Sequence, residues 1–395
     1  MSVIVVGAGA AGLVAAGFAA AMGAPVTLLE RTKDGGRKIL ISGGGRCNVL
    51  PSVLAPERFV TASPPHLLRA MLKSWPLHEQ RSFFEGELGI PLALEEESGK
   101  LFPRSNKARD VRDGLVMFAE RSGARLRFNS FVTSITRSNG GFSIATPGES
   151  FTCDRLIIAT GGLSVPATGS DGTGLRIARE LGHELIATYP ALTPLLADGD
   201  RHAALSGVSL TARLRSKDRD KPIETVGGFL FTHRGYSGPS VLDISHVTER
   251  DERPVIRAQW AAFSADDLTG KDEFVSTILT RKIPSRLAEQ LLRECAIPRD
   301  RRTSSLKRDE RNSLIEAVTS YVLPWSGNEG YKKAEVTGGG VALTEVDPKT
   351  LESRKVKGLY LCGEMLDAFG PIGGHNFCWA WATGRAAGRA AGNLR

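Results

Sequence analysis

The chain has 395 residues, of which 41% are hydrophobic, 24% are charged and 44 are glycine. This length excludes a single compact core and predicts two or three domains, and the composition is that of a soluble globular protein rich in tight backbone turns. The formal net charge of +8 permits an acidic partner such as a nucleic acid. Because acidic residues are interleaved with the basic ones along the chain, we interpret the charge as an ordinary solvated surface.

The cysteines and the uncharged N-terminal segment exclude several classes of protein. The cysteines are odd in number, lie far apart and form no CxxC pair, so they predict reduced thiols in a cytoplasmic protein and no metal site: Cys47, Cys153, Cys295, Cys362 and Cys378. The first 29 residues carry no charged side chain, but they lack the basic flank of a signal peptide or a membrane helix. We therefore expect no membrane span.

The first motif joins a strand to a helix. A β-branched run at residues 3–6 is followed by the glycine motif of residues 7–12 and by an alanine-rich helical stretch to about Met22. Gly7 permits a tight turn, Gly9 lets phosphates approach the backbone, and Gly12 lets the helix pack on the strand. The helix N-terminus then offers its free N–H groups to a pyrophosphate, so the motif predicts a dinucleotide site.

The next segment extends this motif. A predicted strand at residues 26–29 ends in Glu30, whose carboxylate is placed to accept the hydroxyls of an adenosine ribose and would repel a 2′-phosphate. The alternative is a surface residue at a strand end. The pair Gly35-Gly36 follows, and the order GxGxxG, acid, GG is typical of glutathione-reductase-like flavoproteins rather than of NAD-binding domains.

Two remote segments fit the same fold. Residues 155–160 form a hydrophobic strand that ends at Thr160 and Gly161, and a strand at residues 358–364 ends in Gly363 and Glu364. The glycine-rich loop 370–377 then leads into an alanine-rich helix at residues 378–391. Its N-terminus would favour the negatively charged reduced flavin, although an ordinary loop before a terminal helix explains the glycines as well.

Four stretches together resemble one bacterial family, the BaiN/YhiN-like NAD(P)/FAD-dependent oxidoreductases. They are GGRKILISGGGRCNV at residues 35–49, LFPRSNKA at 101–108, ATGGLSVPATGSDGTGLRIARELGH at 159–183, and the long segment at 334–384. The resemblance implies an α/β fold in which a Rossmann-like FAD-binding domain is split by a small β-barrel and a helical bundle. The implied parts are residues 1–192 and 325–395 for the FAD-binding domain, 193–262 for the barrel and 263–324 for the bundle. Short β-like runs up to residue 261 and helically spaced leucines after residue 285 agree with this division.

By this resemblance the backbone around Ser42 and Gly44 wraps the flavin, and Val132, in a predicted strand at 131–135, contacts the adenine. Arg37 and Lys38 either neutralise phosphate charge or face solvent. The motifs and the resemblance together assign these residues to FAD: Gly7, Gly9, Ala10, Ala11, Gly12, Glu30, Arg31, Gly36, Arg37, Lys38, Ser42, Gly44, Gly45, Arg46, Cys47, Val132, Thr160, Gly161, Gly363, Glu364, Gly374, Asn376 and Phe377.

The implied activity is hydride transfer through flavin N5, from NAD(P)H to a small or medium hydrophobic acceptor such as an activated C=C bond. The glycines at 169–174 follow no strand, so we interpret them as a helix cap and expect NAD(P)H to dock only transiently. Candidate catalytic groups are His375 and Arg46, with Tyr236 as a further donor. The alternative for His375 is a packed, hydrogen-bonded side chain.

Two other functions stay open at this point. One is a flavin-containing protein that binds or modifies RNA, but nucleic acid is not the expected partner because the insert lacks a basic stripe interleaved with aromatic residues. The other is a sensor in which FAD does not turn over. A disulfide reductase is not expected, because neither Cys47 nor Cys378 has a second cysteine spaced as a redox partner.

Overall fold

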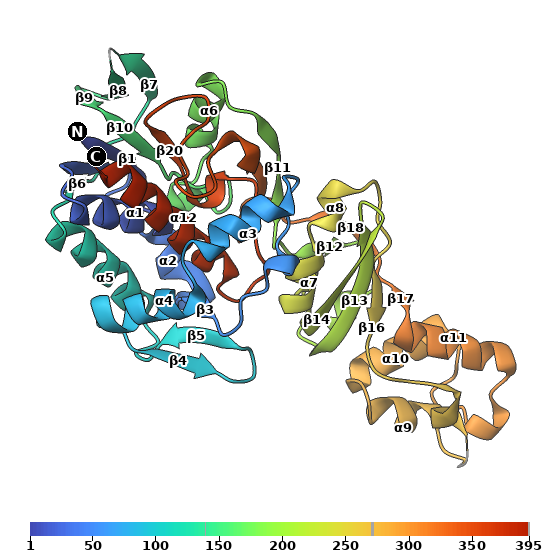
Figure 1. The fold of residues 1–395 in the computed structure, drawn as a ribbon. Coiled ribbons are helices and arrows are strands. Elements are labelled where there is room, and N and C mark those ends of the chain that lie inside the picture. Colours follow the sequence, from blue (N-terminus) through green and yellow to red (C-terminus); the bar gives the residue numbers. More distant parts are fainter. Residues whose placement is uncertain (139, 270–271, 394–395) are drawn as a thin grey trace. The chain divides into compact units, whose positions relative to one another are not determined.

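The computed structural model describes residues 1–138, 140–269 and 272–393. The chain divides into two compact units, which we name unit 1 (Met1–Tyr189 and Glu335–Arg395) and unit 2 (Pro190–Ala334). Figure 1 labels most of the elements of both units. These boundaries lie close to the predicted ones at residues 193 and 324, and we propose that each unit is a domain. None of the helices in the described part of the chain has the length and apolarity of a membrane span.

Unit 1 is built on the predicted parallel sheet. Its strand order is β20-β10-β1-β2-β6, and all neighbouring pairs are parallel. Every residue of β1 is buried, as a strand covered by helices on both faces requires. The strands are β1 (Val3–Val6), β2 (Val26–Leu29), β6 (Arg125–Arg127), β10 (Arg155–Ile158) and β20 (Leu359–Leu361). The central strand β1 and the edge strand β20 therefore come from opposite ends of the chain.

The helices α1 (Ala10–Ala21) and α12 (His375–Gly392) pack against each other beside this sheet. Figure 1 shows the C-terminal α12 lying along the N-terminal α1. A Cβ atom placed on Gly384, Gly388 or Gly392 would lie 2.4, 2.4 or 2.5 Å from a carbonyl oxygen of α1. The oxygens belong to Ala11, Ala15 and Ala19, respectively. Because only glycine lets the two backbones approach this closely, the sequence of α12 fixes its contact with α1.

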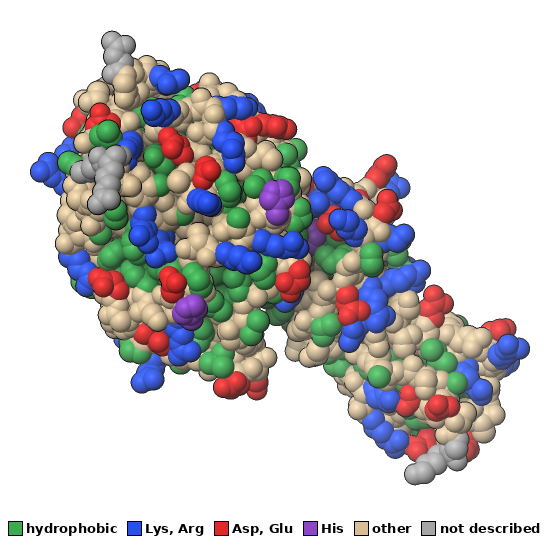
Figure 2. All heavy atoms as spheres, viewed as in Figure 1, with side chains coloured by type: hydrophobic (Ala, Val, Ile, Leu, Met, Phe, Trp, Pro, Cys, Tyr) green, Lys and Arg blue, Asp and Glu red, His purple; other side chains and the backbone are tan. Residues whose placement is uncertain are grey.

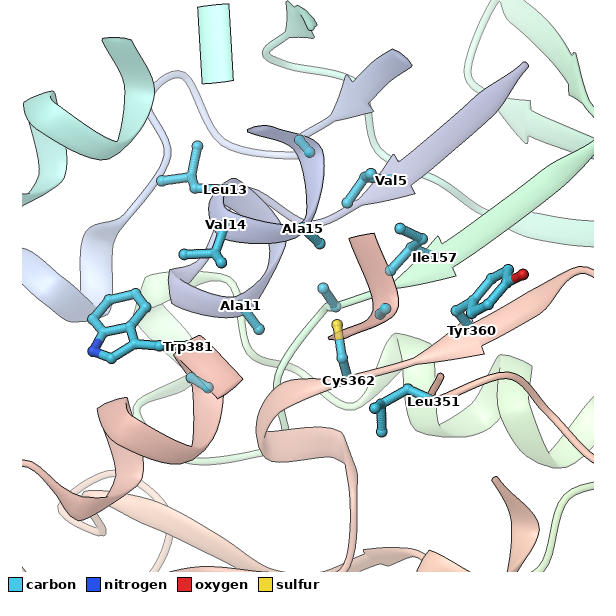
Figure 3. Packing of buried hydrophobic residues seen from close by; sticks show 14 of the residues in the cluster. Val5, Ala11, Leu13, Val14, Ala15, Ile157, Leu351, Tyr360, Cys362 and Trp381 are labelled. Carbon is cyan, nitrogen blue, oxygen red and sulfur yellow. The ribbon is translucent and has the colours of Figure 1, made fainter. Parts of the chain in front are cut away.

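Figure 3 shows the core that this contact closes, in which Ala11 and Ala15 lie among side chains from β1, β10 and α12. The other elements of unit 1 are α2 (Arg37–Ile41), β3 (Leu50–Pro51), α3 (Pro65–Lys73), α4 (Leu77–Ser82), β4 (Leu92–Glu95), β5 (Lys100–Pro103), α5 (Ala108–Arg121), β7 (Ser134–Ser138), β8 (Gly141–Thr146), β9 (Glu149–Cys153), α6 (Thr173–Glu180), β11 (Leu185–Ala191) and β19 (Val336–Val341). The strand predicted at 131–135 begins only at Ser134, so Val132 lies in the segment before β7.

Unit 2 contains a seven-stranded sheet in the order β17-β16-β13-β14-β15-β12-β18. Its two edge strands, β17 and β18, follow the helical segment in sequence, whereas the other five strands precede it, so the helices α9 to α11 form an insertion between strands of this sheet. Its core gathers Phe229, Phe231, Tyr236 and Trp260 with leucines of α10. The elements are β12 (Leu195–Ala197), β13 (Ser209–Asp218), β14 (Lys221–Phe231), β15 (Gly235–Ser237), α7 (Pro239–Ile244), α8 (Val247–Arg250), β16 (Arg257–Gln259), α9 (Val275–Thr280), α10 (Ser285–Glu294), α11 (Arg308–Thr319), β17 (Tyr321–Val322) and β18 (Trp325–Asn328).

The glycine contact between α1 and α12 predicts a specific loss of stability. Gly388→Ala should lower the free energy of unfolding by about 1–3 kcal/mol, because the added methyl group overpacks against the backbone of α1. The matched control is Gly86→Ala, since a Cβ on Gly86 meets nothing within 4 Å. Urea denaturation of both variants measures the difference, and equal midpoints would contradict the close backbone contact.

Candidate functional site

A cavity of about 460 Å³ lies within unit 1, where the loops after β1, β2, β10 and β20 meet. This volume lies within the range of small-molecule and cofactor sites, about 300–1,000 Å³. The position is the one that parallel α/β sheets use for ligands, beyond the carboxyl ends of their strands. Residues from both ends of the chain line the cavity, so it depends on their packing together.

Most residues that the sequence assigned to the cofactor line this cavity. Gly12, Gly45, Cys47 and His375 are not among the lining residues. The assigned residues that do line it are Gly7, Gly9, Ala10, Ala11, Glu30, Arg31, Gly36, Arg37, Lys38, Ser42, Gly44, Arg46, Val132, Thr160, Gly161, Gly363, Glu364, Gly374, Asn376 and Phe377.

The glycines at the start of α1 have separate tasks. Gly7 has a φ of +102°, and a Cβ there would lie 2.7 Å from the Ala159 carbonyl oxygen, which fixes the turn after β1. A Cβ on Gly12 would lie 1.8 Å from the Gly7 carbonyl oxygen, so Gly12 serves packing rather than the ligand. Gly9 meets nothing within 4 Å and lines the cavity. The open space therefore lies where the α1 dipole and N–H groups favour an anion.

Glu30 closes the cavity at the end of β2. It is 8% exposed, and its Oε2 accepts the backbone N–H of Ala8 at 2.7 Å. Its Oε1 accepts the backbone N–H and the hydroxyl of Thr32 at 2.8 and 2.7 Å. A carboxylate offers about four acceptor positions, so these three bonds fix the side chain and leave room for a further donor such as a ribose hydroxyl.

A second charged group connects both ends of the chain. The Lys38 ammonium donates to Glu364 Oε2 at 2.7 Å and to the Ser164 hydroxyl at 2.6 Å. Ser164 donates in turn to Glu364 Oε1, which also accepts the backbone N–H of Thr337 at 3.0 Å. The charge of Lys38 is thus met by a carboxylate within the chain. Reading along the sequence cannot find this contact, because Lys38 and Glu364 are 326 residues apart.

The loop before α6 also belongs to the site. The Arg31 guanidinium pairs with Asp171 and lies 4.5 Å from the centroid of the Phe131 ring. Burial raises the pKa of Asp171, but hydrogen bonds from Arg31 and Thr173 outweigh it and hold that pKa below its usual range. The sequence predicts a helix cap at residues 169–174. The structure places Gly172 as the N-cap and brings residues 168–171 to the cavity wall.

Arg46 is held in place at the cavity wall by Phe102 and Glu95. Its guanidinium carbon lies 4.0 Å from the centroid of the Phe102 ring, and its Nη1 lies 3.0 Å from Glu95 Oε1. The Phe102 ring itself packs against the backbone, because a Cβ on Gly43 would lie 3.1 Å from it. Hydrogen bonds from Ser98 and Arg46 lower the pKa of Glu95, so the carboxylate stays charged opposite Arg46. Arg46 therefore presents a preorganised cation.

Lys100 is a second cation here, and it was not among the residues predicted from the sequence. A Cβ on Gly373 would lie 3.7 Å from Lys100 Cε, so the lysine stem packs on the loop before α12. The sequence offered one indication of its role: Lys100 directly precedes residues 101–108, one of the four stretches that resemble the flavoprotein family. We name this part of the cavity the Arg46 corner, formed by Gly43, Arg46, Lys100, Phe102 and Gly373.

The loop before α12 is held by the amide side chains of Asn376 and Asn48. Asn376 accepts the N–H of Gly370 and donates to its carbonyl, both at 2.9 Å. Asn48, with its amide oriented to satisfy both partners, accepts the N–H of Gly374 at 3.0 Å. Phe377 stacks on Trp381 with ring centroids 5.2 Å apart. These contacts join the segment at residues 42–48 to the start of α12.

The cysteine thiols and the histidine ring near the cavity are buried and uncharged at neutral pH. Burial raises the pKa of the Cys47 and Cys378 thiols to about 12, so neither is a thiolate at neutral pH. Burial lowers the pKa of His375 to about 4, and its ring packs edge-on to Phe59 with centroids 6.0 Å apart. Its imidazole is therefore neutral at pH 7.

Comparisons with known proteins show the family and the fold of the chain. Residues 1–390 match the family described as HI0933-like protein Rossmann domain. The ribosomal RNA dihydrouridine synthase of Escherichia coli is 33% identical over 389 residues, which cover 96% of this chain and 95% of that protein. The 3-dehydro-bile acid delta(4,6)-reductase of Clostridium scindens is 34% identical over 404 residues and 98% of each chain. The 3-ketosteroid delta1-dehydrogenase structure from Sterolibacterium denitrificans, at 12% identity and a TM-score of 0.53, covers 100% of this chain and 99% of its own. That likeness shows the fold.

The residues of the cavity fit FAD. Gly9 leaves space where a Cβ would stand, beside the N-terminus of α1. The Thr160 hydroxyl lines the cavity, is buried and has no hydrogen-bond partner within the described ranges. Glu30 and Val132 would hold the adenosine, the start of α1 the pyrophosphate, and residues 42–46 and 373–377 the flavin part.

Glu30 offers a direct test of cofactor binding. Glu30→Gln keeps the size of the side chain but removes its charge, and its amide would face the N–H of Ala8 or Thr32 as a second donor. We expect the dissociation constant for FAD to rise about 10- to 100-fold, the usual value of a charged hydrogen bond. Quenching of flavin fluorescence measures it. Exposed Glu149→Gln is the control, and equal FAD affinity in both variants would remove Glu30 from the site.

Buried histidines predict how stability changes with pH. The folded-state pKa of His375, and that of His246, lies near 4 because of burial, below the unfolded value of about 6.5. The unfolded chain binds more protons between these values, so stability should fall as the pH drops from 6.5 to 4, by up to about 1.4 kcal/mol per pH unit for each histidine. Urea midpoints of His375→Gln should depend less on pH than those of wild type or of exposed His66→Gln. An unchanged slope would contradict the buried neutral imidazole.

Proposed function

The chain belongs to the HI0933-like Rossmann family and is an FAD-dependent oxidoreductase, and we propose that it reduces a C=C bond conjugated to a carbonyl, with NAD(P)H as the electron source. The names of two of its relatives support this reaction class. Dihydrouridine is uridine with the C5=C6 bond saturated, and that bond is conjugated to a ring carbonyl. A delta(4,6)-reductase of a 3-oxo bile acid acts on double bonds conjugated to the 3-oxo group. One reaction type thus accounts for both names.

The observation that carries the proposal is the Arg46 corner. When bound, the flavin supplies hydride exchange at its N5. Reduction adds a hydride to the β-carbon and a proton to the α-carbon, while negative charge develops on the carbonyl oxygen. NAD(P)H is oxidised to NAD(P)⁺, so the two electrons balance. Cations held in place near that oxygen stabilise the developing charge, and such preorganised electrostatic stabilisation is usually the main contribution of a protein to a reaction of this kind.

Arg46 and Lys100 suit this task in different ways. The Arg46 guanidinium is fixed by Phe102 and Glu95, so it would orient the acceptor carbonyl at little cost in conformational entropy. The Lys100 ammonium has three rotatable donors, and we assign to it the proton that the α-carbon takes. The neutral, buried His375 would instead support the loop before α12.

Rival functions differ in what they require of the cofactor. A sensor that does not turn over would keep its flavin oxidised when NADH or NADPH is added without oxygen, whereas the proposed reductase should bleach. A colourless preparation that FAD fails to reconstitute would contradict every flavin-dependent function. For the reduced protein, re-oxidation by cyclic enones and by uridine compounds distinguishes the class of acceptor.

Variants of the Arg46 corner test the proposed roles. Arg46→Gln should slow re-oxidation of the reduced protein by an α,β-unsaturated ketone about 10²-fold, the usual effect of removing one donor to a developing oxyanion. Lys100→Met should slow the same step by at least about 10²-fold, because it removes the proton donor to the α-carbon. The flavin spectrum and the rate of bleaching by NAD(P)H should change little. Lys107→Met, an exposed lysine outside the cavity lining, is the control. Stopped-flow re-oxidation at wild-type rates in both corner variants would contradict the proposal.

A further inference from the structure

The outer face of the unit 2 sheet carries an array of cations. Along β13, Ala212 and Leu214 are buried in the core, while Arg213, Arg215 and Lys217 alternate with them and point to the other side. The side chains of Arg213 and Arg215 are 41% and 51% exposed. Residues two apart in a strand are separated by about 6.8 Å on one face. This alternation gives one row of three cations along the strand.

Strand pairing places a fourth cation directly beside this row. Arg215 lies opposite Arg257 of β16, whose side chain is 45% exposed. Like charges directly opposite each other in a sheet are unfavourable, so this pair does not serve stability. Two carboxylates lie nearby: Glu224 contacts both Arg213 and Arg215, and Glu316 lies 3.9 Å from Arg257. Four cations thus face two carboxylates, which leaves an excess of positive charge.

Uncharged side chains occupy several of the neighbouring outer positions, among them Gln259, which lies opposite Arg213 in β16. Val226 lies opposite Arg213 and is 57% exposed, and Val322 lies opposite Arg257 and is 49% exposed. Thr211 pairs with Gly228 on the same face. No large side chain separates the cations in these rows, so an extended ligand could contact several of them at once.

We propose that this surface, the cationic sheet face of Arg213, Arg215, Lys217 and Arg257, binds the phosphate backbone of RNA. The inference rests on the proposed function: the acceptor would be a uracil base of an RNA, whose C5=C6 bond is conjugated to a carbonyl. Arginine forks bind phosphate oxygens bidentately, and a row of cations with a repeat of about 6.8 Å matches a chain of phosphates better than a single compact anion.

A nucleic acid was not expected from the sequence, because the insert has no basic stripe interleaved with aromatic residues along the chain. Here the cations gather across strands. Arg257 joins Arg213 and Arg215 only through the register of β13 with β16. Binding would therefore rest on phosphate contacts, which are insensitive to base sequence, and base choice would rest with the cavity of unit 1.

The test replaces three cations of the face in the full-length holoprotein. Binding of a fluorescein-labelled, uridine-containing RNA hairpin is followed by anisotropy over a range of salt concentrations. The variant R213Q/R215Q/R257Q should bind at least tenfold more weakly at low salt, and its salt dependence should be shallower by about one unit of log–log slope for each cation removed. R281Q/R299Q/R302Q removes the same charge from the helical part of unit 2, at residues that pair with Glu273, Glu289 and Asp272, and should bind as wild type does.

Three outcomes would overturn the inference: no RNA binding by wild type, equal loss in both triple variants, or unchanged binding by the face variant. Anionic vesicles and polyglutamate serve as competitors, and stronger binding of either than of RNA would also overturn it. Reduction of a cyclic enone by the face variant is measured in parallel. Normal enone reduction with lost RNA binding supports both proposals, whereas RNA binding through the face without reduction of any conjugated C=C would contradict the proposed function alone.

Discussion

The contact between the two ends of the chain is the constraint on which the site depends. Gly384, Gly388 and Gly392 let α12 lie against the backbone of α1. The loops that precede these two helices, the glycine turn at 7–9 and the loop at 370–374, therefore open on one cavity. No side chain could replace the glycines without pushing the helices apart. The binding site contains residues more than 350 positions apart in sequence. They come together because three positions of α12 carry no side chain that would separate the two helices.

Three cations that line the cavity beside the predicted dinucleotide site are each paired with a carboxylate. Lys38 is held by Glu364, Arg37 by Asp34 and Arg31 by Asp171. The negative charge of a bound dinucleotide would therefore be met chiefly by the N–H groups and dipole of α1, which carry no counter-ion. Basic and acidic side chains are likewise interspersed over the molecular face in Figure 2. Against that background, the excess of cations on the outer sheet of unit 2 stands apart.

The sequence predicted those parts of the site that depend on backbone shape. Gly7, Gly9 and Glu30 occupy the turn, the open space and the strand end that their spacing indicates. It did not predict contacts that arise from packing of distant segments: Lys38 with Ser164, Arg46 with Phe102, or Lys100 against Gly373. The predicted strand at 131–135 begins only at Ser134, because side-chain pattern alone does not fix where pairing with β8 starts. The spacing of residues in the sequence also does not show that His375 and Cys47 are buried, and burial is what keeps both side chains uncharged.

A crystal structure of the protein with FAD tests the central claim most directly. We expect ribose hydroxyls within hydrogen-bond distance of Glu30, the pyrophosphate at the N-terminus of α1, and the isoalloxazine ring against the backbone at residues 43–45 and 373–374. An FAD bound elsewhere, or one whose ring system points away from Arg46 and Lys100, would contradict the claim.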